Sequence, residues 1–299
     1  MGRCAVCGSD RSRVLYEATA TAAHTTSSAY YVPTYSHARL HGEISRCAAC
    51  GFVFVSDRLP ERDLERAYAE MADPGYLREA GVYRRAADWV LARLEPWRSA
   101  GARLLDIGCG TGFLLEQARE AGWDVRGIEL SRWMVEQARQ RLPGDVVRQG
   151  GYDSGHFREI AFDVVVAVDV IEHVPDPEAF VREIGSRLRP GGIACLVTPD
   201  IGSLVARALG EGWWYIQVPH LNYFDRSTLA RLVGRLGLRV VRQASYPRFV
   251  TPEIVRNRLG YLPAPLRAPA GLLLALLLGA GRTARVDLGD QLMMLASKP

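Results

Sequence analysis

The chain of 299 residues is 48% hydrophobic and 23% charged, with a formal net charge of +4 at pH 7. This composition is that of an ordinary globular protein, and the length allows one large domain together with a small one. The mild charge does not favour a nucleic-acid-binding protein, for which a concentrated basic face is expected. Because residues 1–10 contain no apolar signal core, we expect a cytoplasmic protein.

Four of the six cysteines form two CxxC pairs near the N-terminus, Cys4 with Cys7 and Cys47 with Cys50. Cysteines at this spacing, without a secretory signal, indicate a metal site rather than a disulfide framework. Four thiolates complete the tetrahedral shell of zinc and leave no open position, so we expect a structural ion. Residues 1–58 are therefore predicted to form a zinc-binding module. Free thiols and an iron site are the alternatives.

Residues 59–98 are predicted to form a helical linker or cap, because apolar side chains recur there at helical spacing before Pro96. From residue 99 onward, strand-like and helix-like segments alternate, which is typical of an α/β fold with a mostly parallel sheet covered on both faces. The expected strands are 103–107, 123–129, 145–149, 162–169 and 192–198. The expected helices are 112–121, 132–142, 177–188 and 226–236.

Two further strands are expected in the tail, at 239–245 and 290–296, as the antiparallel end of the sheet. Residues 99–299 are therefore assigned to one α/β domain with a helical insertion near 252–285. Its apolar run at 270–281 is shorter than the roughly 20 residues that a membrane-spanning helix needs. A buried helix is the simpler interpretation, and an interfacial helix that makes a peripheral membrane contact is the alternative.

A glycine-rich turn follows the first expected strand of this domain, within Leu104-Leu105-Asp106-Ile107-Gly108-Cys109-Gly110-Thr111-Gly112. Glycines there let the backbone approach a ligand at the carboxyl edge of the sheet. A dinucleotide fingerprint would carry a further glycine three residues after Gly110, but that position is Phe113. Glu129 ends the second expected strand, where a carboxylate can accept the protons of both ribose hydroxyls.

The segments LLDIGCGTG, GIELS, FDVVVAVDVIEHVPDP and LRPGG follow one another in this order. Over residues 100–245 they resemble the successive motifs of class I S-adenosylmethionine-dependent methyltransferases, in particular the ubiquinone-biosynthesis O-methyltransferases and related small-molecule enzymes. The resemblance implies a Rossmann-like seven-stranded sheet with a reversed last strand, and S-adenosyl-L-methionine as the cofactor. The cofactor-binding positions that it implies are Asp106, Gly108, Cys109, Gly110, Gly112, Glu129, Leu130, Gly151 and Asp169.

Three side chains near the acceptor end of the implied site are candidates for catalysis, namely Asp169, His173 and His220. Asp169 ends the fourth strand, and His173 follows it in a Glu-His pair that could instead cap the next helix or brace the cofactor loop. His220 lies in a PxHLxxF segment behind the aromatic residues 213–215, which indicates an acceptor pocket or lid. We expect His220 to be the general base; a hydrogen-bonded structural histidine is the alternative.

These features predict an enzyme that methylates a small molecule, a glycan or a lipid-linked intermediate, with oxygen as the preferred acceptor atom. A second interpretation is an RNA methyltransferase that holds RNA with the zinc module, and a third is a cofactor-binding scaffold without catalysis. Residues 1–58 contain six arginines and four acidic residues, a weak surface for binding phosphates. The sequence identifies neither the acceptor nor the oligomeric state.

Overall fold

The computed structural model describes residues 3–34, 39–251, 254 and 283–299. Its largest element is a sheet of seven strands in the order β10-β13-β8-β7-β4-β5-β6. In chain order these strands are β4 (Arg103–Ile107), β5 (Asp124–Glu129), β6 (Val147–Gln149), β7 (Phe162–Val168), β8 (Leu188–Pro199), β10 (Arg239–Ser245) and β13 (Gln291–Ser297).

The sheet is mostly parallel, and β13 runs antiparallel to both of its neighbours, β8 and β10. Parallel pairing joins β4 to β5 and β7, β5 to β6, and β7 to β8. The expected α/β fold with a seven-stranded sheet and a reversed last strand is confirmed. β8 begins earlier than expected, because the Arg-Pro-Gly-Gly segment at 189–192 continues the strand instead of preceding it.

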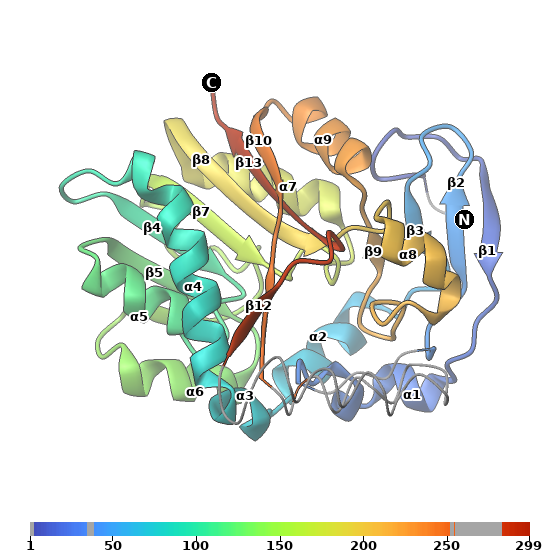
Figure 1. Cartoon of the computed structure of the whole chain (residues 1–299), viewed down its shortest axis with the longest axis horizontal. Helices are drawn as coiled ribbons and strands as arrows, with labels where there is room; N and C mark the ends of the chain where they lie inside the picture. Colours follow the sequence, from blue (N-terminus) through green and yellow to red (C-terminus); the bar gives the residue numbers. More distant parts are fainter. Residues whose placement is uncertain (1–2, 35–38, 252–253, 255–282) are drawn as a thin grey trace.

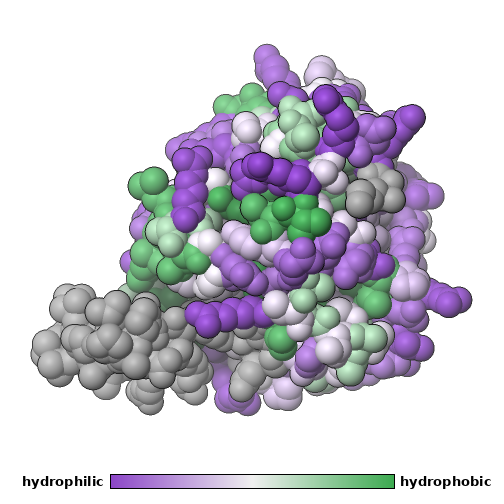
Figure 2. Space-filling model, turned by 90° about the vertical axis from the view of Figure 1, so that its right-hand side faces the viewer, coloured by the Kyte–Doolittle hydropathy of each residue, from purple (hydrophilic) through white to green (hydrophobic). Residues whose placement is uncertain are grey.

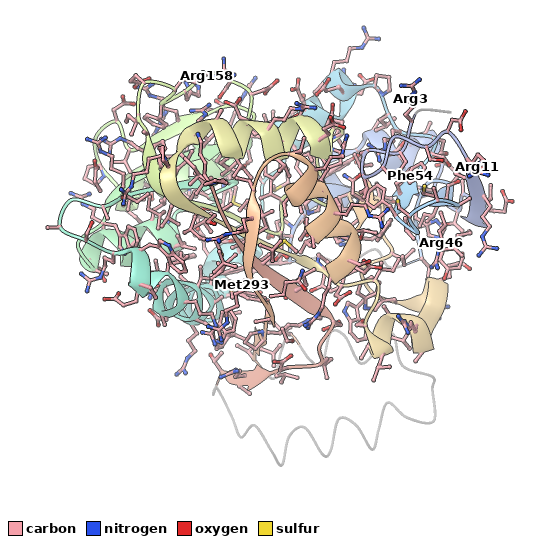
Figure 3. The ribbon with its side chains drawn as sticks, turned by 90° about the horizontal axis from the view of Figure 1, so that it is seen from above. Arg3, Arg11, Arg46, Phe54, Arg158 and Met293 are labelled. Atoms are coloured by element: carbon pink, nitrogen blue, oxygen red, sulfur yellow. The ribbon has the colours of Figure 1, made fainter. Side chains whose placement is uncertain are left out.

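Helices cover both faces of this sheet (Figure 1). One face packs against α4 (Ala80–Leu94), α5 (Phe113–Glu120) and α6 (Arg132–Arg141), and the other against α7 (Pro177–Arg187) and α9 (Arg226–Arg235). Adjacent strand residues alternate between the two cores: Leu104 belongs to the first and Leu105 to the second. Figure 3 shows α7 and α9 lying side by side over the sheet.

A second sheet, which is antiparallel, is formed mainly by the N-terminal module. Its four strands are β1 (Ser12–Tyr16), β2 (Ile44–Cys47), β3 (Val53–Val55) and β9 (Asn222–Tyr223). The boundary expected at residue 58 does not separate this sheet from the larger domain, since its fourth strand comes from residues 222–223. The module also includes α1 (Ala22–Thr26) and the 3-10 turn η1 (Ser28–Tyr31).

The linker expected to be helical at 59–98 contains three helices and a 3-10 turn: α2 (Glu61–Ala69), α3 (Pro74–Arg78), α4 and η2 (Glu95–Trp97). The chain turns between α2 and α3 because Asp73 caps α3, accepting a hydrogen bond from the backbone of Tyr76, and Pro74 starts the helix. Between β8 and β13 lie α8 (Leu204–Leu209), η3 (Gly210–Gly212) and a hairpin of β11 (Arg248–Val250) with β12 (Ala284–Val286), none of which we expected.

The helical insertion expected at 252–285, with its apolar run at 270–281, lies outside the described residues except for Ile254 and 283–285. Among the residues that are described, no helix is long and apolar enough to cross a membrane. The face shown in Figure 2 carries mainly hydrophilic side chains with smaller hydrophobic groups between them. The cytoplasmic location and the peripheral membrane contact stay predictions.

Candidate active site

A cavity of about 770 Å³ opens where β4, β5 and β7 end, at the carboxyl edge of the parallel strands. Helices α2, α3 and α4, together with residues 31–34, form its opposite wall. This size is in the range of small-molecule sites, and the position is where open α/β sheets bind their ligands. The expected site residues that line it are Asp106, Gly108, Cys109, Gly110, Glu129, Leu130, Gly151, Asp169, His173 and His220.

The glycine turn after β4 forms one wall of the cavity. Gly108 has φ of 76°, and a Cβ there would lie 2.5 Å from Cγ2 of Val170, so a larger residue would clash. Gly112, which we expected to line the cofactor site, is not among the lining residues. Gly112 precedes α5 and has φ of 84°, and a Cβ there would contact Ala138 and Leu142. A glycine at this position therefore leaves room for α5 to pack against α6.

Glu129 points back across this turn from the end of β5. Its Oε2 accepts a hydrogen bond of 2.9 Å from the backbone of Gly110, and its Oε1 accepts one of 2.8 Å from Ser131. Burial raises the pKa of Glu129, and the backbone donors oppose that shift. Burial also raises the pKa of Asp106 well above its usual range, with the nearby charge of Glu129 acting in the same direction. A cationic ligand bound beside them would stabilise the charged form of both desolvated carboxyl groups.

Aromatic rings cover the turn from the helical side. Tyr76 and Tyr83 stack with centroids 3.7 Å apart, and Tyr83 lies parallel to Phe113 of α5 at 6.2 Å. Tyr76 and Tyr83 were not predicted as site residues. Their spacing of seven is compatible with one helical face, but the break between α3 and α4 removes that simple periodicity.

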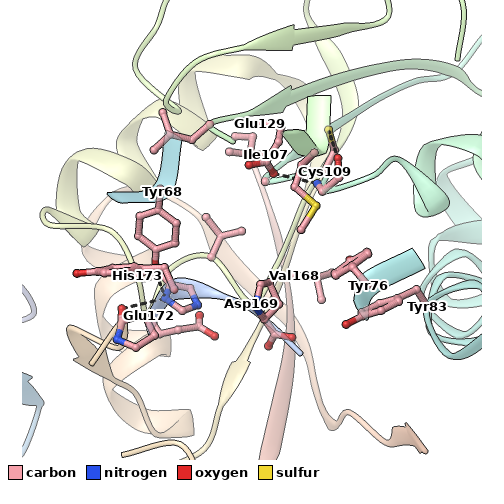
Figure 4. Close-up of a pocket in the computed structure, with 18 of the residues that line it drawn as sticks. Tyr68, Tyr76, Tyr83, Ile107, Cys109, Glu129, Val168, Asp169, Glu172 and His173 are labelled. Carbon is pink, nitrogen blue, oxygen red and sulfur yellow. Dashed lines mark hydrogen bonds between the residues drawn. The ribbon is translucent and has the colours of Figure 1, made fainter. Parts of the chain in front are cut away.

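The other end of the cavity contains a Glu-His-His cluster, defined as Glu172, His173 and His220. One carboxylate oxygen and one ring nitrogen from each histidine lie within 4.8 Å of one another. Oε2 of Glu172 accepts a hydrogen bond of 2.9 Å from Thr198, whereas its buried Oε1 has no hydrogen-bond partner among the described residues. Figure 4 shows Glu172 and His173 beside Tyr68, away from Cys109. A carboxylate with two imidazoles could accept a proton or hold a divalent ion.

Nδ1 of His173 contacts two oxygen atoms. It lies 2.9 Å from the carbonyl oxygen of Pro219 and 2.7 Å from the hydroxyl of Tyr68. A carbonyl can only accept, so the bond to Pro219 forms when Nδ1 carries the proton, which leaves a lone pair on Nε2; in the other tautomer Nδ1 accepts from the Tyr68 hydroxyl. Burial lowers the pKa of His173 to about 4. Tyr68 was missed as a site residue because its position on α2 indicated only a helical face.

His220 is 3% exposed and lies against the ring of His173, with centroids 4.7 Å apart. It stacks on Tyr215, and its Nε2 accepts a hydrogen bond of 2.9 Å from the side-chain amide of Gln217. Burial, followed by the proximity of His173, lowers the pKa of His220 well below 6.5. Asp169 lies beyond the cluster at the end of β7, with φ of 54°, and its Oδ1 accepts a hydrogen bond from Gln291.

The chain matches a known protein family. A family model described as a methyltransferase domain matches residues 76–243, which is more than half of the chain. The chain belongs to the class I S-adenosylmethionine-dependent methyltransferases. It is an enzyme of this family, and S-adenosylmethionine is its cofactor.

Curated relatives match the methyltransferase over part of its length. It is 40% identical over 116 residues to a ubiquinone biosynthesis O-methyltransferase of Xanthomonas axonopodis pv. citri, covering 37% of this chain and 47% of the relative. It is 32% identical over 154 residues to a malonyl-[acyl-carrier protein] O-methyltransferase of Enterobacter lignolyticus, covering 51% and 60%. The chain therefore spans about half the length of the curated relatives it matches.

The solved structures support the fold of the methyltransferase. A SAM-dependent methyltransferase of Thermotoga maritima superposes with a TM-score of 0.51 at 21% identity. The match covers 75% of this chain and 95% of that one.

The methyltransferase also has a four-cysteine cluster, made of Cys4, Cys7, Cys47 and Cys50, none of which lines the cavity. The Sγ atoms of Cys4 and Cys50 are 3.6 Å apart, as are those of Cys7 and Cys47. Tetrahedral zinc with bonds of about 2.3 Å would separate its sulfur ligands by roughly 3.8 Å, so the four thiols fit this ion. The positive φ angles of Gly8 and Gly51 turn the chain after each pair.

Proposed function

We propose that the protein transfers the methyl group of S-adenosylmethionine to a hydroxyl oxygen of a small molecule, a glycan or a lipid-linked intermediate. The observation that carries this proposal is the shared cavity, in which the glycine turn and Glu129 lie at one end and the Glu-His-His cluster at the other. The O-methyltransferase names of the curated relatives support oxygen as the acceptor atom.

In the proposed reaction the hydroxyl oxygen of the acceptor forms a bond to the methyl carbon while the bond from that carbon to sulfur breaks. The hydroxyl proton passes to the Glu-His-His cluster, and S-adenosylhomocysteine leaves. In the tautomer that donates from Nδ1 to Pro219, Nε2 of His173 has a lone pair and is the proposed proton acceptor, and His220 packs against that ring. The cofactor supplies the activated methyl group, so the protein contributes orientation and a base.

The experiment that tests this function uses labelled S-adenosylmethionine with fractionated small-molecule and glycan extracts. We expect label to enter one extractable product and to stay there after alkaline hydrolysis of esters if the product is an ether. Folded protein that failed to bind either S-adenosylmethionine or S-adenosylhomocysteine in calorimetry would contradict the proposal. Label that entered RNA instead would establish the alternative acceptor class.

Replacing His220 with alanine is expected to lower turnover at least about tenfold, and His173→Ala should have an effect of the same order, because each removes one ring of the proton-accepting cluster. Binding of S-adenosylhomocysteine should stay within about twofold of the wild-type value, since the two rings do not contact the glycine turn. His24→Ala is the control, because His24 is a half-buried histidine in the first turn of α1 that does not belong to the cavity lining. Unchanged turnover in both variants would remove the histidines from the reaction.

The pH dependence of methyl transfer should reflect the lowered histidine pKa values. A base acts in its neutral form, and burial keeps His173 neutral down to about pH 4. The acid limb of the pH–rate profile is therefore expected below 6.5, the ordinary value for histidine. A limb at or above 6.5, measured under single-turnover conditions, would show that another group with a higher pKa controls the reaction.

We further propose that the four-cysteine cluster holds one structural zinc ion. The support is the fit of the four sulfur positions to a tetrahedral ion and the complete set of four thiolate ligands, which leaves no coordination site for a substrate.

A further inference from the structure

Two side chains, Arg58 and Asn222, bond the N-terminal sheet to the loop at the acceptor end of the cavity. Asn222 lies on β9, the strand that completes the four-stranded sheet by pairing with β3. Arg58 lies three residues after the end of β3 along the chain. Both side chains reach the loop at 171–175, which carries Glu172 and His173.

Asn222 holds this loop from inside. Its Nδ2 donates hydrogen bonds to the carbonyl oxygens of Ile171, at 3.2 Å, and Val174, at 2.8 Å. Its backbone nitrogen, and that of Leu221, donate to the carbonyl oxygen of Glu172 at 3.0 and 2.7 Å. Asn222 is 1% exposed, so these bonds are shielded from competition with water.

Arg58 bonds to Asn222, to the loop at 171–175 and to β3. Its Nη2 donates to Oδ1 of Asn222 at 2.9 Å, its Nη1 donates to the carbonyl oxygen of Pro175, and its Nε donates to Val55 of β3 at 2.9 Å. The guanidinium therefore connects the module strand, the asparagine and the far end of the loop. Burial lowers the pKa of Arg58 to about 10, which still leaves it charged at neutral pH.

The same contacts determine how the two histidines meet. His220 precedes Asn222 by two residues, and His173 bonds to the carbonyl of Pro219 in the same segment. The loop and the 219–222 segment are thus joined on both sides of the ring pair. The glycine turn and Glu129 take no part in these bonds, because their hydrogen bonds run to β5 and to Ser131.

We propose that Arg58 and Asn222 are positioning residues, through which the four-cysteine module orients His173 and His220 for the acceptor without contributing to the cofactor end. The module would then be a working part of the acceptor site rather than a separate binding domain. This inference rests on the proposed role of the two histidines, but it concerns their geometry, which can be measured without a known acceptor.

The test compares Asn222→Asp and Arg58→Met with the matched control Arg66→Met, an exposed arginine on α2 whose ion-pair partner is Asp63. Asn222→Asp keeps the shape of the side chain and its acceptor for Arg58, but removes the two donated bonds to the loop. The ring resonances of His173 are followed by NMR from pH 8 down to 3.5 in the full chain prepared with zinc, and the zinc content is measured at each pH because thiolate ligands release the ion in acid. Glu172, His220 and Tyr68 face the same ring, so all three stay unchanged in these variants.

In the wild-type protein we expect His173 to titrate near pH 4. In both positioning variants we expect His173 to lose its hydrogen bond to Pro219. Its pKa should then rise by at least about one unit, as water replaces the buried contacts and because both variants make the surroundings of the ring more negative. Binding of S-adenosylhomocysteine should remain within about threefold of wild type, and Arg66→Met should change neither property. Once an acceptor is found, turnover should fall while the KM for S-adenosylmethionine stays constant.

An unchanged His173 titration in Asn222→Asp would overturn the inference. A parallel loss of cofactor affinity would overturn it as well, because the effect would then extend through the whole domain. If Arg58→Met does not fold, Asn222→Asp decides, and failure of that near-isosteric variant to fold would assign Asn222 to folding rather than positioning. A wild-type protein that bound no S-adenosylhomocysteine would refute the proposed function, yet the titration would still test the positioning contacts.

Discussion

Glu129→Ala is expected to weaken binding of S-adenosylhomocysteine by about 100-fold or more. Hydrogen bonds to a charged group contribute roughly 1.5–3 kcal/mol each, and the carboxylate would lose two such bonds to the ribose hydroxyls. The variant also leaves the backbone donors of Gly110 and Ser131 without the oxygens that now accept from them. Both effects act at the cofactor end of the cavity. We therefore expect no other single replacement of a lining side chain to reduce the affinity for the cofactor as much.

Calorimetry with S-adenosylhomocysteine measures this change directly. Glu129→Gln should give an intermediate loss, because the amide keeps one acceptor oxygen but places a donor where the second acceptor stood. Glu136→Ala, on the exposed side of α6, is the matched control and should bind normally. Wild-type affinity in Glu129→Ala would show that the cofactor's ribose lies elsewhere.

Removal of the proposed zinc ion is expected to have the largest effect on stability. Cys47→Ser, or treatment with a strong chelator, should lower the metal content from one zinc per chain to nearly none and reduce the Tm by about 10 °C or more. Cys4 and Cys47 are 4% and 2% exposed and belong to the same core as α7 and α9. Phe52, two residues after Cys50, packs on Phe224 at 4.9 Å, so loss of the metal should loosen the second face of the large sheet.

Metal analysis and thermal unfolding followed by circular dichroism provide the measurement. Cys195→Ala is the control: Cys195 is fully buried in β8 and lies outside the four-cysteine cluster, so this variant can lose stability but should retain its zinc. A Cys47→Ser protein with unchanged metal content and an unchanged Tm would contradict a structural zinc site.

Local patterns in the sequence were sufficient to predict much of the cofactor end of the cavity. The apolar strand before Gly108, the glycines that follow and Glu129 at the end of the next strand lie within one βαβ unit, where chain connectivity brings them together. The cysteine pairs carry similar local information, because each CxxC turn presents two thiols and four thiols suffice for one ion. The two tail strands were predicted from the pattern as the antiparallel end of the sheet, and the family resemblance implied the same reversed last strand.

The acceptor end depended on the tertiary structure. His173 and His220 are far apart in the sequence, and their contact with each other and with Tyr68 requires the module, the linker and two loops to meet. Strand β9 has two residues, too few for a periodic signal, yet it joins the module to the large domain. The role of Gly112 was likewise decided by its neighbours on α6. Sequence periodicity reports which face of an element is buried, whereas the partner that covers this face is selected by long-range packing, which leaves no local pattern.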